Sequence, residues 1–542
     1  GQEWRIIMKL SIEGIKDKKE WEKAGIKLPS YDVEKVASAT KSAPVWVHFG
    51  IGNIFRIFIG GIADSLLEQG LSDKGITCVE TFDYDVVDKI YEPFDNLVMA
   101  VTLKEDGSTD KKVLGSLTEA VKAQSSVEAE WSRLKTIFAS PKLQMVSFTI
   151  TEKGYALHDA KGEFFPFIKS DIDNGPDKAA SAMAVVAALL FERFNTCKAP
   201  LAVVSMDNCS HNGEKLRNSI TEMVSEWAKK GFVGEDFVQY VNDENTISFP
   251  WSMIDKITPR PADTVAKALE EAGVEAMAPV ITSKKTYIAP FVNAEGPQYL
   301  VIEDRFPNGR PQLEKAGVYM TDRDTVNKVE RMKVTTCLNP LHTALAVYGC
   351  VLGYDLIADE MKDSELSELV RRIGLVEGMP VVTNPGIIDP VKFADEVINV
   401  RIPNPFMPDT PQRIATDTSQ KVGIRYGETI KAYVAKDGSA SSLTAIPLAI
   451  AGWCRYLLGV DDDGAAFELS PDPMAEELKE QLKGIVIGDA STYTGQLRNL
   501  LSNANIFGIN LYEAGIGDKI ENMFIEEISG KGAVRETLRK YL

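Results

Sequence analysis

A short apolar run that ends in glycine, followed at once by a helical pattern, is the feature that most restricts how this chain folds. The run APVWVHFG covers residues 43–50, and after Gly52 the apolar side chains recur at helical spacing as far as Leu67. A second apolar run, GITCVETFD, covers residues 75–83. Strand, tight turn, helix and strand together predict one β-α-β unit of a parallel sheet.

Further strand and helix patterns alternate along the chain before residue 322. We predict strands at Leu97–Val101, Gln144–Ile150, Leu201–Met206 and Pro279–Ile281, and helices at Ala179–Phe194 and Glu214–Lys230. Such alternation is typical of an α/β fold with a doubly wound parallel sheet. The stretch TYIAPFVNAEGPQYLVIEDRF, residues 286–306, has the pattern of a hairpin.

The pattern changes at about residue 322, after which long helical segments such as LHTALAVYGCVLGY dominate. We therefore predict two domains. A Rossmann-type dinucleotide-binding domain covers residues 1–321, and a mostly helical substrate and catalytic domain covers residues 322–542. Small-molecule sites commonly form at domain interfaces, so the active site is expected between the two.

Charge and cysteine usage exclude several classes of function. The net charge of −18 argues against a nucleic-acid partner, because binding phosphates requires clustered Lys and Arg. No apolar run approaches the roughly 18 residues of a membrane span, and the first residues lack the apolar segment of a signal peptide. The six cysteines are scattered, as in a reducing compartment. We expect a cytoplasmic protein with no membrane partner.

The glycine turn predicts a dinucleotide site, with the candidate residues Gly50, Gly52, Asn53, Ile54 and Phe55. Glycine lets the backbone approach a pyrophosphate, and the helix that follows offers N–H donors. Phe55 replaces the usual third glycine, so an ordinary tight turn is the alternative.

Acidic residues after the second apolar run favour NAD over NADP. Glu80 and Asp83 are placed to accept hydrogen bonds from ribose hydroxyls, and they would repel a 2′-phosphate. A solvated acidic loop is the alternative. In the later block TITEKGY, we expect Thr151 and Glu152 to lie on the nicotinamide side.

Histidine and tyrosine spacing disfavours the two commonest dehydrogenase chemistries. The four histidines form no zinc-ligand pattern; they are His48, His158, His211 and His342. The one Tyr-x-x-x-Lys pair, Tyr31–Lys35, precedes the glycine turn, which is the wrong order for a short-chain dehydrogenase. A metal-independent enzyme therefore needs another base.

Two polar clusters supply candidates for that base. SMDNCSHNGEKLRN places Asn208 after a strand, and ERMKVTTCLNPLH places Lys333, Asn339 and His342 close together. A lysine shielded from water can accept a hydroxyl proton near neutral pH, and an asparagine amide can stabilise a developing alkoxide. Surface and capping residues can have the same spacing, so the cluster alone leaves both interpretations open.

Several blocks occur in an order that resembles the long-chain mannitol dehydrogenase family, which includes mannitol 2-dehydrogenase, fructuronate reductase and tagaturonate reductase. The blocks are GIGNIFR, TITEKGY, SMDNCSHNGEKLR, FPWSMIDKITP, VIEDRFPNGRPQLEKAGV and the Lys–Asn–His block. The resemblance extends to FELSPDP, residues 467–473. It implies a Rossmann-type domain, a helical domain and a zinc-independent reaction with lysine as general acid and base.

The resemblance also implies roles for particular residues. Lys333 is the expected base, Asn208 and Asn339 are the expected oxyanion-stabilising pair, and His342 is expected to position the substrate. Glu330 is expected to relay protons, with a surface ion pair as the alternative.

Substrate binding is implied for Asp255 and for Arg413 and Lys421 in the block RIATDTSQK. A capping or structural role is the alternative for Asp255. Thr416 stands where mannitol-oxidising members of the family carry histidine, which puts polyol specificity in doubt.

One departure from the family concerns the catalytic block itself. One extra residue separates Lys333 from Asn339, and in a regular helix one residue rotates a side chain by about 100°. Either the helix starts late or contains a bulge, or the assignment of the two residues must change.

Together these observations predict an NAD-dependent, metal-independent oxidoreductase of carbohydrate metabolism. It would interconvert a secondary alcohol and a ketone on an open-chain sugar acid or polyol. Arg413 and Lys421 favour a hexuronate substrate of the fructuronate/mannonate type, because both can pair with a carboxylate. The alternatives are a mannitol 2-dehydrogenase acting on mannitol and fructose, a sugar-phosphate dehydrogenase, and a catalytically silent NAD-binding protein.

Overall fold

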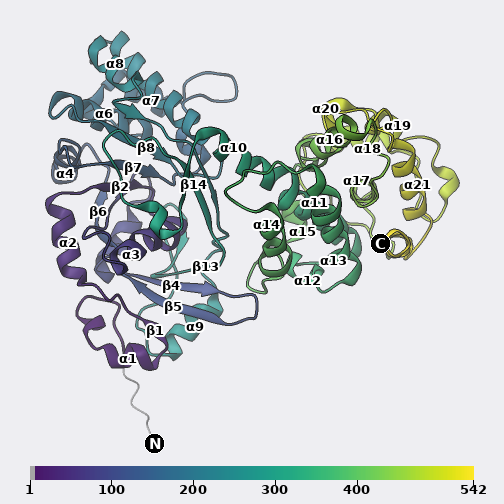
Figure 1. The fold of residues 1–542 in the computed structure, drawn as a ribbon, viewed down its shortest axis with the longest axis horizontal. Coiled ribbons are helices and arrows are strands. Elements are labelled where there is room, and N and C mark those ends of the chain that lie inside the picture. Colours follow the sequence, from purple (N-terminus) through teal and green to yellow (C-terminus); the bar gives the residue numbers. More distant parts are fainter. Residues whose placement is uncertain (1–6) are drawn as a thin grey trace, which may run out of the picture. The chain divides into compact units, whose positions relative to one another are not determined.

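The computed structural model describes residues 7–542, which form two compact units (Figure 1). The first unit comprises the residues up to Leu103 and Ser108–Asn327. The second comprises Lys104–Gly107 and Lys328–Leu542. Within residues 7–542, no helix has the length and apolar character needed to cross a membrane.

A six-stranded parallel sheet forms the centre of the first unit, with the order β6-β3-β2-β7-β8-β9. Along the chain its strands are β2 (Trp46–Phe49), β3 (Ile76–Glu80), β6 (Leu117–Lys122), β7 (Met145–Phe148), β8 (Leu201–Ser205) and β9 (Ile247–Ser248). Numbered from one to six in chain order, they follow the spatial order 3-2-1-4-5-6 of the Rossmann fold. The predicted doubly wound α/β fold is confirmed.

Both faces of this sheet are covered, so the strands β2, β3, β7 and β8 are buried along their whole length and are mostly apolar. Successive side chains of β2 point to opposite faces, so Trp46 joins one buried cluster and Val47 the other. The cluster around Trp46 includes α3 (Gly60–Glu68), and the cluster around Val47 includes α4 (Glu128–Phe138), α6 (Ala182–Asn195) and α7 (Asn212–Lys229). The unit also contains α1 (Lys18–Lys23), α2 (Val33–Ser42), α5 (Pro166–Asn174), α8 (Glu235–Asn242) and α9 (Asp263–Glu271).

Two predicted strands exist but belong to other sheets. The strand predicted at Leu97–Val101 is β4 (Val98–Leu103), in a four-stranded sheet of order β1-β5-β4-β13. The strand predicted at Pro279–Ile281 is β11 (Val280–Ile281), which pairs only with β12 (Tyr287–Ile288). Apolar periodicity identifies a strand but does not say which neighbour it joins.

The hairpin predicted at residues 286–306 is wrong. β13 (Phe291–Glu295) pairs with β4, whereas β14 (Tyr299–Glu303) pairs with β10 (Ser252–Asp255) and β15 (Tyr319–Thr321). The two strands follow each other along the chain but lie in separate sheets.

The remaining strands are β1 (Ile26–Lys27) and β5 (Thr109–Leu114), which belong to the four-stranded sheet of β4 and β13.

The second unit is built around α11 (Asn339–Leu352) and α17 (Ala445–Tyr456), which pack against each other. All residues of α17 are buried, because α21 (Gly517–Glu527) and other helices surround it. The other helices are α10 (Arg323–Met332), which begins before the second unit, α12 (Ile357–Glu360), α13 (Ser364–Arg371), α14 (Pro390–Glu396), α15 (Pro411–Ile414), α16 (Glu428–Asp437), α18 (Ala475–Gln481), α19 (Arg498–Leu501), α20 (Ala504–Phe507) and α22 (Ala533–Tyr541).

A carboxyl group lies in the core of this unit. Glu527 is fully buried in α21, and burial is the main reason that its pKa rises to about 8. Asp462 and Glu526 raise the pKa further, whereas Arg455 and Tyr348 lower it. The folded chain therefore keeps this carboxyl protonated at pH values at which an unfolded chain would ionise it.

We expect Glu527→Gln to stabilise the protein more at pH 8 than at pH 5. Folding takes up a proton between the ordinary glutamate pKa and about 8, so the stability of the wild type falls as pH rises through that window. Glutamine removes this loss, and the gain should reach a few kcal/mol, because one pKa unit corresponds to about 1.4 kcal/mol. Urea unfolding of the wild type and Glu527→Gln at pH 5 and pH 8 measures the difference in the free energy of unfolding. An equal effect at both pH values, or the same effect in the exposed control Glu536→Gln, would contradict the prediction.

Candidate active site

The glycine turn after β2 has the backbone geometry that its sequence implies. Gly50 has a φ of +91°, and a Cβ atom there would lie 2.1 Å from the carbonyl oxygen of Thr149. Only glycine fits at this position. Gly52 differs, because a Cβ atom added there meets no heavy atom within 4 Å. The space beside Gly52 is therefore open to a ligand.

A helix begins directly after this turn. The amide of Arg56 donates to the carbonyl of Gly52 over 3.1 Å, so the preceding amides of Asn53, Ile54 and Phe55 belong to the first turn and have no partner within the helix. Open space beside glycine and free helix N–H groups together fit the pyrophosphate of a dinucleotide. Phe55 itself is fully buried, and its ring stacks on that of His48 in β2. Its side chain therefore packs against the strand that precedes the turn.

Glu80, the last residue of β3, and Asp83, in the loop that follows, are both buried, so the alternative of a solvated loop is wrong. Glu80 accepts backbone hydrogen bonds from Ile51 (3.3 Å), Phe82 (3.1 Å) and Asp83 (3.3 Å), and it thereby ties the glycine turn to the loop after β3. Burial raises the pKa of Glu80. Asp83 accepts a hydrogen bond from Thr282 on one carboxylate oxygen, while the other oxygen is buried without a partner in the described structure.

The loops after β7 and β8 are tied together by a residue that sequence reasoning missed. The Asp207 carboxylate accepts hydrogen bonds from the amides of Ile150 (3.0 Å) and Thr151 (2.9 Å) and from the Tyr155 hydroxyl. Thr151 has a φ of +64°, a rare conformation for a β-branched residue. The signal for Asp207 was its position at the end of a strand, directly before Asn208.

The candidate residues of these loops differ in exposure. Asn208, in the loop after β8, is exposed, and Glu152 is exposed and forms an ion pair with Lys215 over 2.7 Å. Asn212 is buried and structural, since its amide donates to Ser252 and to two backbone carbonyls. Asp255 is the last residue of β10 and is buried.

In the second unit, the extra residue between Lys333 and Asn339 is taken up by a π-helix. The segment η8 (Lys333–Cys337) is π-helical, and the amide of Leu338 donates to the carbonyl of Lys333, five residues earlier, over 3.1 Å. Of the alternatives raised by the spacing, the structure shows the bulge in η8, and it also starts a new helix, α11, at Asn339 after a bend at Leu338. Single π-turns of this kind occur frequently at functional sites. The Lys333 side chain is only 7% exposed.

Asn339 and His342 lie on one face of α11, because residues three and four apart share a face of a helix. Thr343 extends that face. The side-chain oxygen of Asn339 is buried and has no hydrogen-bond partner in the described part of the chain. A buried polar atom without a partner is unusual and is what a site awaiting a ligand would show. Glu330, in the last turn of α10, is half-buried.

The predicted substrate-binding cations have different surroundings. Arg413 is exposed and paired with Asp409, and Lys421 is half-buried. Burial, followed by the charge of Arg425, lowers the pKa of Lys421. Arg425 was missed in the sequence, although it follows Lys421 by one helical turn. Its guanidinium is half-buried and donates to the Thr343 hydroxyl over 2.6 Å.

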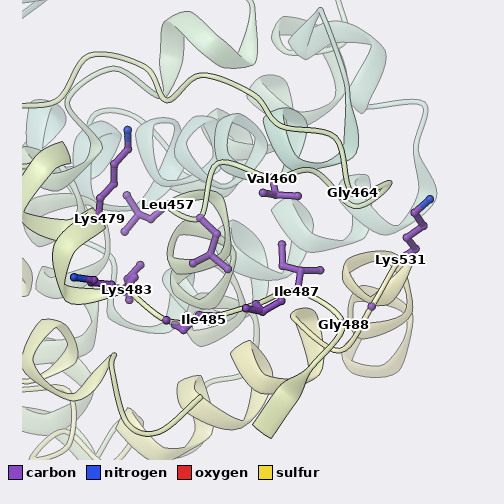
Figure 2. Close-up of a pocket in the computed structure, with 14 residues that line it drawn as sticks. Leu457, Val460, Gly464, Lys479, Lys483, Ile485, Ile487, Gly488 and Lys531 are labelled. Carbon is purple, nitrogen blue, oxygen red and sulfur yellow. The ribbon is translucent and has the colours of Figure 1, made fainter. Parts of the chain in front are cut away.

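The second unit also contains a cavity of about 680 Å³, which Figure 2 shows with its lining residues. Its apolar lining includes Leu457, Val460 and Ile487, and Lys479 and Lys531 are among its lysines. None of the predicted site residues lines it. As for metals, residues 7–542 contain no group of three His, Cys, Asp or Glu side chains arranged to hold an ion.

Two family models match this chain. Residues 45–315 match the mannitol dehydrogenase Rossmann domain, and residues 325–524 match the mannitol dehydrogenase C-terminal domain. The chain is 53% identical over 536 residues to the D-mannonate oxidoreductase of Thermotoga maritima, covering 98% of this chain and 99% of the relative. It is 28% identical to the D-mannonate oxidoreductase of Escherichia coli, covering 83% and 86% of the two chains.

The chain is also similar to solved structures of two polyol dehydrogenases. The mannitol 2-dehydrogenase of Pseudomonas fluorescens, in a ternary complex with NAD and D-mannitol, is 26% identical with a TM-score of 0.66, covering 98% of this chain and 99% of that one. A substrate-free D-sorbitol dehydrogenase is 25% identical with a TM-score of 0.74, covering 93% and 98%.

Proposed function

Since the chain belongs to the mannitol dehydrogenase family, we propose that it is the D-mannonate oxidoreductase of its cell, interconverting D-mannonate and D-fructuronate with NAD. The chain is an NAD-dependent dehydrogenase that acts on CH–OH groups of sugar acids or polyols. The observation that supports D-mannonate as the substrate is the 53% identity, over 98% of the chain, with the D-mannonate oxidoreductase of Thermotoga maritima.

The glycine turn would hold the cofactor. Gly52 leaves room for the pyrophosphate, and the amides of Asn53, Ile54 and Phe55 would bind it. Asp83 has a free carboxylate oxygen for a ribose hydroxyl, and Glu80 holds the turn in shape and adds negative charge against a 2′-phosphate. A dinucleotide held by these residues would supply the hydride acceptor for oxidation of the alcohol carbon. Gly50, Thr151 and Glu152 complete the proposed site.

The protein's own residues would move the proton. Lys333, shielded from water, accepts the proton of the C2 or C5 hydroxyl during oxidation and returns it during reduction. The amides of Asn208 and Asn339 would donate to the substrate oxygen as negative charge develops on it. His342, on the same face of α11 as Asn339, would fix the position of that oxygen.

The remaining roles concern the proton's route and the rest of the substrate. Glu330 would exchange the proton between Lys333 and solvent, since it is half-buried and lies three residues away on the preceding helix. Asp255 would accept hydrogen bonds from substrate hydroxyls, and Arg413 and Lys421 would pair with the carboxylate. The reaction would run in the cytoplasm, because six free thiols suit a reducing compartment.

A substrate panel tests the proposed function. With NAD⁺, we expect kcat/KM for D-mannonate to exceed that for D-mannitol by at least about 10²-fold, because a site built to pair a carboxylate discriminates strongly against its absence. D-Altronate carries the same carboxylate and differs in the configuration of its hydroxyls, so a lower kcat/KM for it would report hydroxyl recognition. With NADH, D-fructuronate should be preferred over D-tagaturonate and D-fructose. A preference for mannitol would replace the proposal with mannitol 2-dehydrogenase, and NADH binding without any turnover would indicate a silent protein.

A further inference from the structure

Two π-helical turns of the second unit are fastened together beside Lys333. The segment η13 (Gly423–Gly427) packs against η8, and three hydrogen bonds join η13 and the following α16 to η8 and the following α11. They run from Arg425 to Thr343 (2.6 Å), from the Tyr426 hydroxyl to the carbonyl of Pro340 (2.6 Å), and from the Thr429 hydroxyl to the carbonyl of Thr335 (3.2 Å). Close packing also fixes η13 on its other side, where a Cβ atom on either glycine would collide with a backbone oxygen of residue 506 or 507.

This fastening places the Arg425 guanidinium at the proposed catalytic face of α11. Thr343, which accepts its hydrogen bond, follows His342 directly and lies one helical turn after Asn339. Residues four apart share a helix face, so Thr343 lies on the face of Asn339, with His342 as its neighbour along the chain. Arg425 is thus held next to the two α11 side chains that are proposed to bind the substrate oxygen.

The charge of Arg425 is not balanced by the protein. Arg413 has Asp409 as its ion-pair partner, and Lys421 lies near Asp417 and Asp472. Within residues 7–542, no carboxylate forms an ion pair with Arg425, whose guanidinium is half-buried. The bond to Thr343 uses one of its five N–H donors, which leaves donors for a bidentate contact with a carboxylate.

We propose that Arg425 binds the carboxylate of the sugar-acid substrate alongside Arg413 and Lys421, and that its charge, which no acidic side chain of residues 7–542 balances, contributes most to selecting an acid over a neutral polyol. This inference rests on the proposed function, because it assigns a binding partner within the same site. A half-buried cation without an acidic neighbour favours an anionic ligand, whereas a neutral hydroxymethyl group would leave its charge unpaired.

The test compares D-mannonate with D-mannonamide, a neutral compound of the same shape and stereochemistry, using the full-length protein and NAD⁺. For Arg425→Gln we expect kcat/KM with mannonate to fall about 10- to 100-fold, mostly through KM, as for loss of a charged hydrogen bond. Activity with mannonamide should change by less than about threefold, because the amide cannot form an ion pair. Arg425→Lys should restore part of the discrimination, and Thr343→Val should weaken it less than Arg425→Gln does.

The controls separate this inference from a structural effect. Arg539→Gln removes one exposed cation from α22 and should leave the ratio of mannonate to mannonamide activity unchanged. If the Arg425 variants lost activity equally with both compounds, the ratio of mannonate to mannonamide activity would be unchanged and the inference would be overturned. The mannonate activity of the wild type would still support the proposed function. A wild type that oxidises mannonate and mannonamide equally well would overturn the inference alone, whereas a wild type without activity on mannonate would overturn the proposed function and the inference with it.

Discussion

Replacing Lys333 with alanine is expected to lower kcat by about 10²- to 10⁴-fold in both directions, the range that a general acid or base contributes. The reason is that the alcohol carbon does not release hydride efficiently unless the proton of its hydroxyl group leaves at the same time. Lys333 is buried at the start of the π-turn and is the proposed acceptor. NADH affinity should change by less than about threefold, since the proposed cofactor contacts lie in the glycine turn of the first unit. Steady-state kinetics and NADH fluorescence titration measure both quantities.

Two further variants make the Lys333 result specific. Lys333→Met preserves most of the buried volume and should be as inactive as alanine, because volume does not replace a proton acceptor. Lys362→Ala removes an exposed lysine, 81% of whose side chain is accessible, and should behave like the wild type. Turnover by Lys333→Ala at the wild-type rate would eliminate this lysine as the base.

The first β-α-β unit could be predicted because its residues are constrained on every side. β2 is buried on both faces, so its apolar run is continuous, and the turn after it requires glycine at position 50. The third strand of the sheet was missed for the opposite reason. β6 lies at the sheet edge, where half of its residues reach partial exposure, so LTEAVK has no continuous apolar run. β4 has such a run and was chosen in its place, although it belongs to another sheet.

The spacing within the catalytic block could be interpreted from the sequence, but its contacts with distant residues could not. Its spacing indicated that a regular helix would misplace Asn339, and the structure takes up the extra residue in the π-turn from Lys333 and the bend at Leu338, after which α11 begins at Asn339. Arg425, by contrast, was not predicted. Its link to Thr343 joins residues 82 positions apart, and nothing in either local sequence specifies that contact. Asp207 is similar, since its bonds to the Thr151 loop depend on the pairing of β7 with β8.

Gly52→Val is expected to raise the dissociation constant of NADH by about 100-fold or more without lowering thermal stability. An added Cβ atom at Gly52 meets no protein atom within 4 Å, so the free enzyme accommodates it. The same side chain would occupy the space proposed for the pyrophosphate and hold it away from the helix N–H groups, whose contacts with the phosphates would be lost. Fluorescence titration and thermal unfolding, carried out on the same preparations, test the two halves of the expectation.

Neighbouring glycines turn this substitution into a controlled series. Gly50→Ala should destabilise the protein whether or not cofactor is present, because its Cβ atom would lie 2.1 Å from the Thr149 carbonyl at a φ of +91°. Gly61→Ala lies within α3, also with no atom near its Cβ, and should add about 0.5–1 kcal/mol of stability without altering NADH affinity. If Gly52→Val bound NADH as the wild type does, the pyrophosphate would have to lie elsewhere. The helix that begins at Asn53 would then have only a structural role, because no other ligand proposed for this chain approaches its first turn.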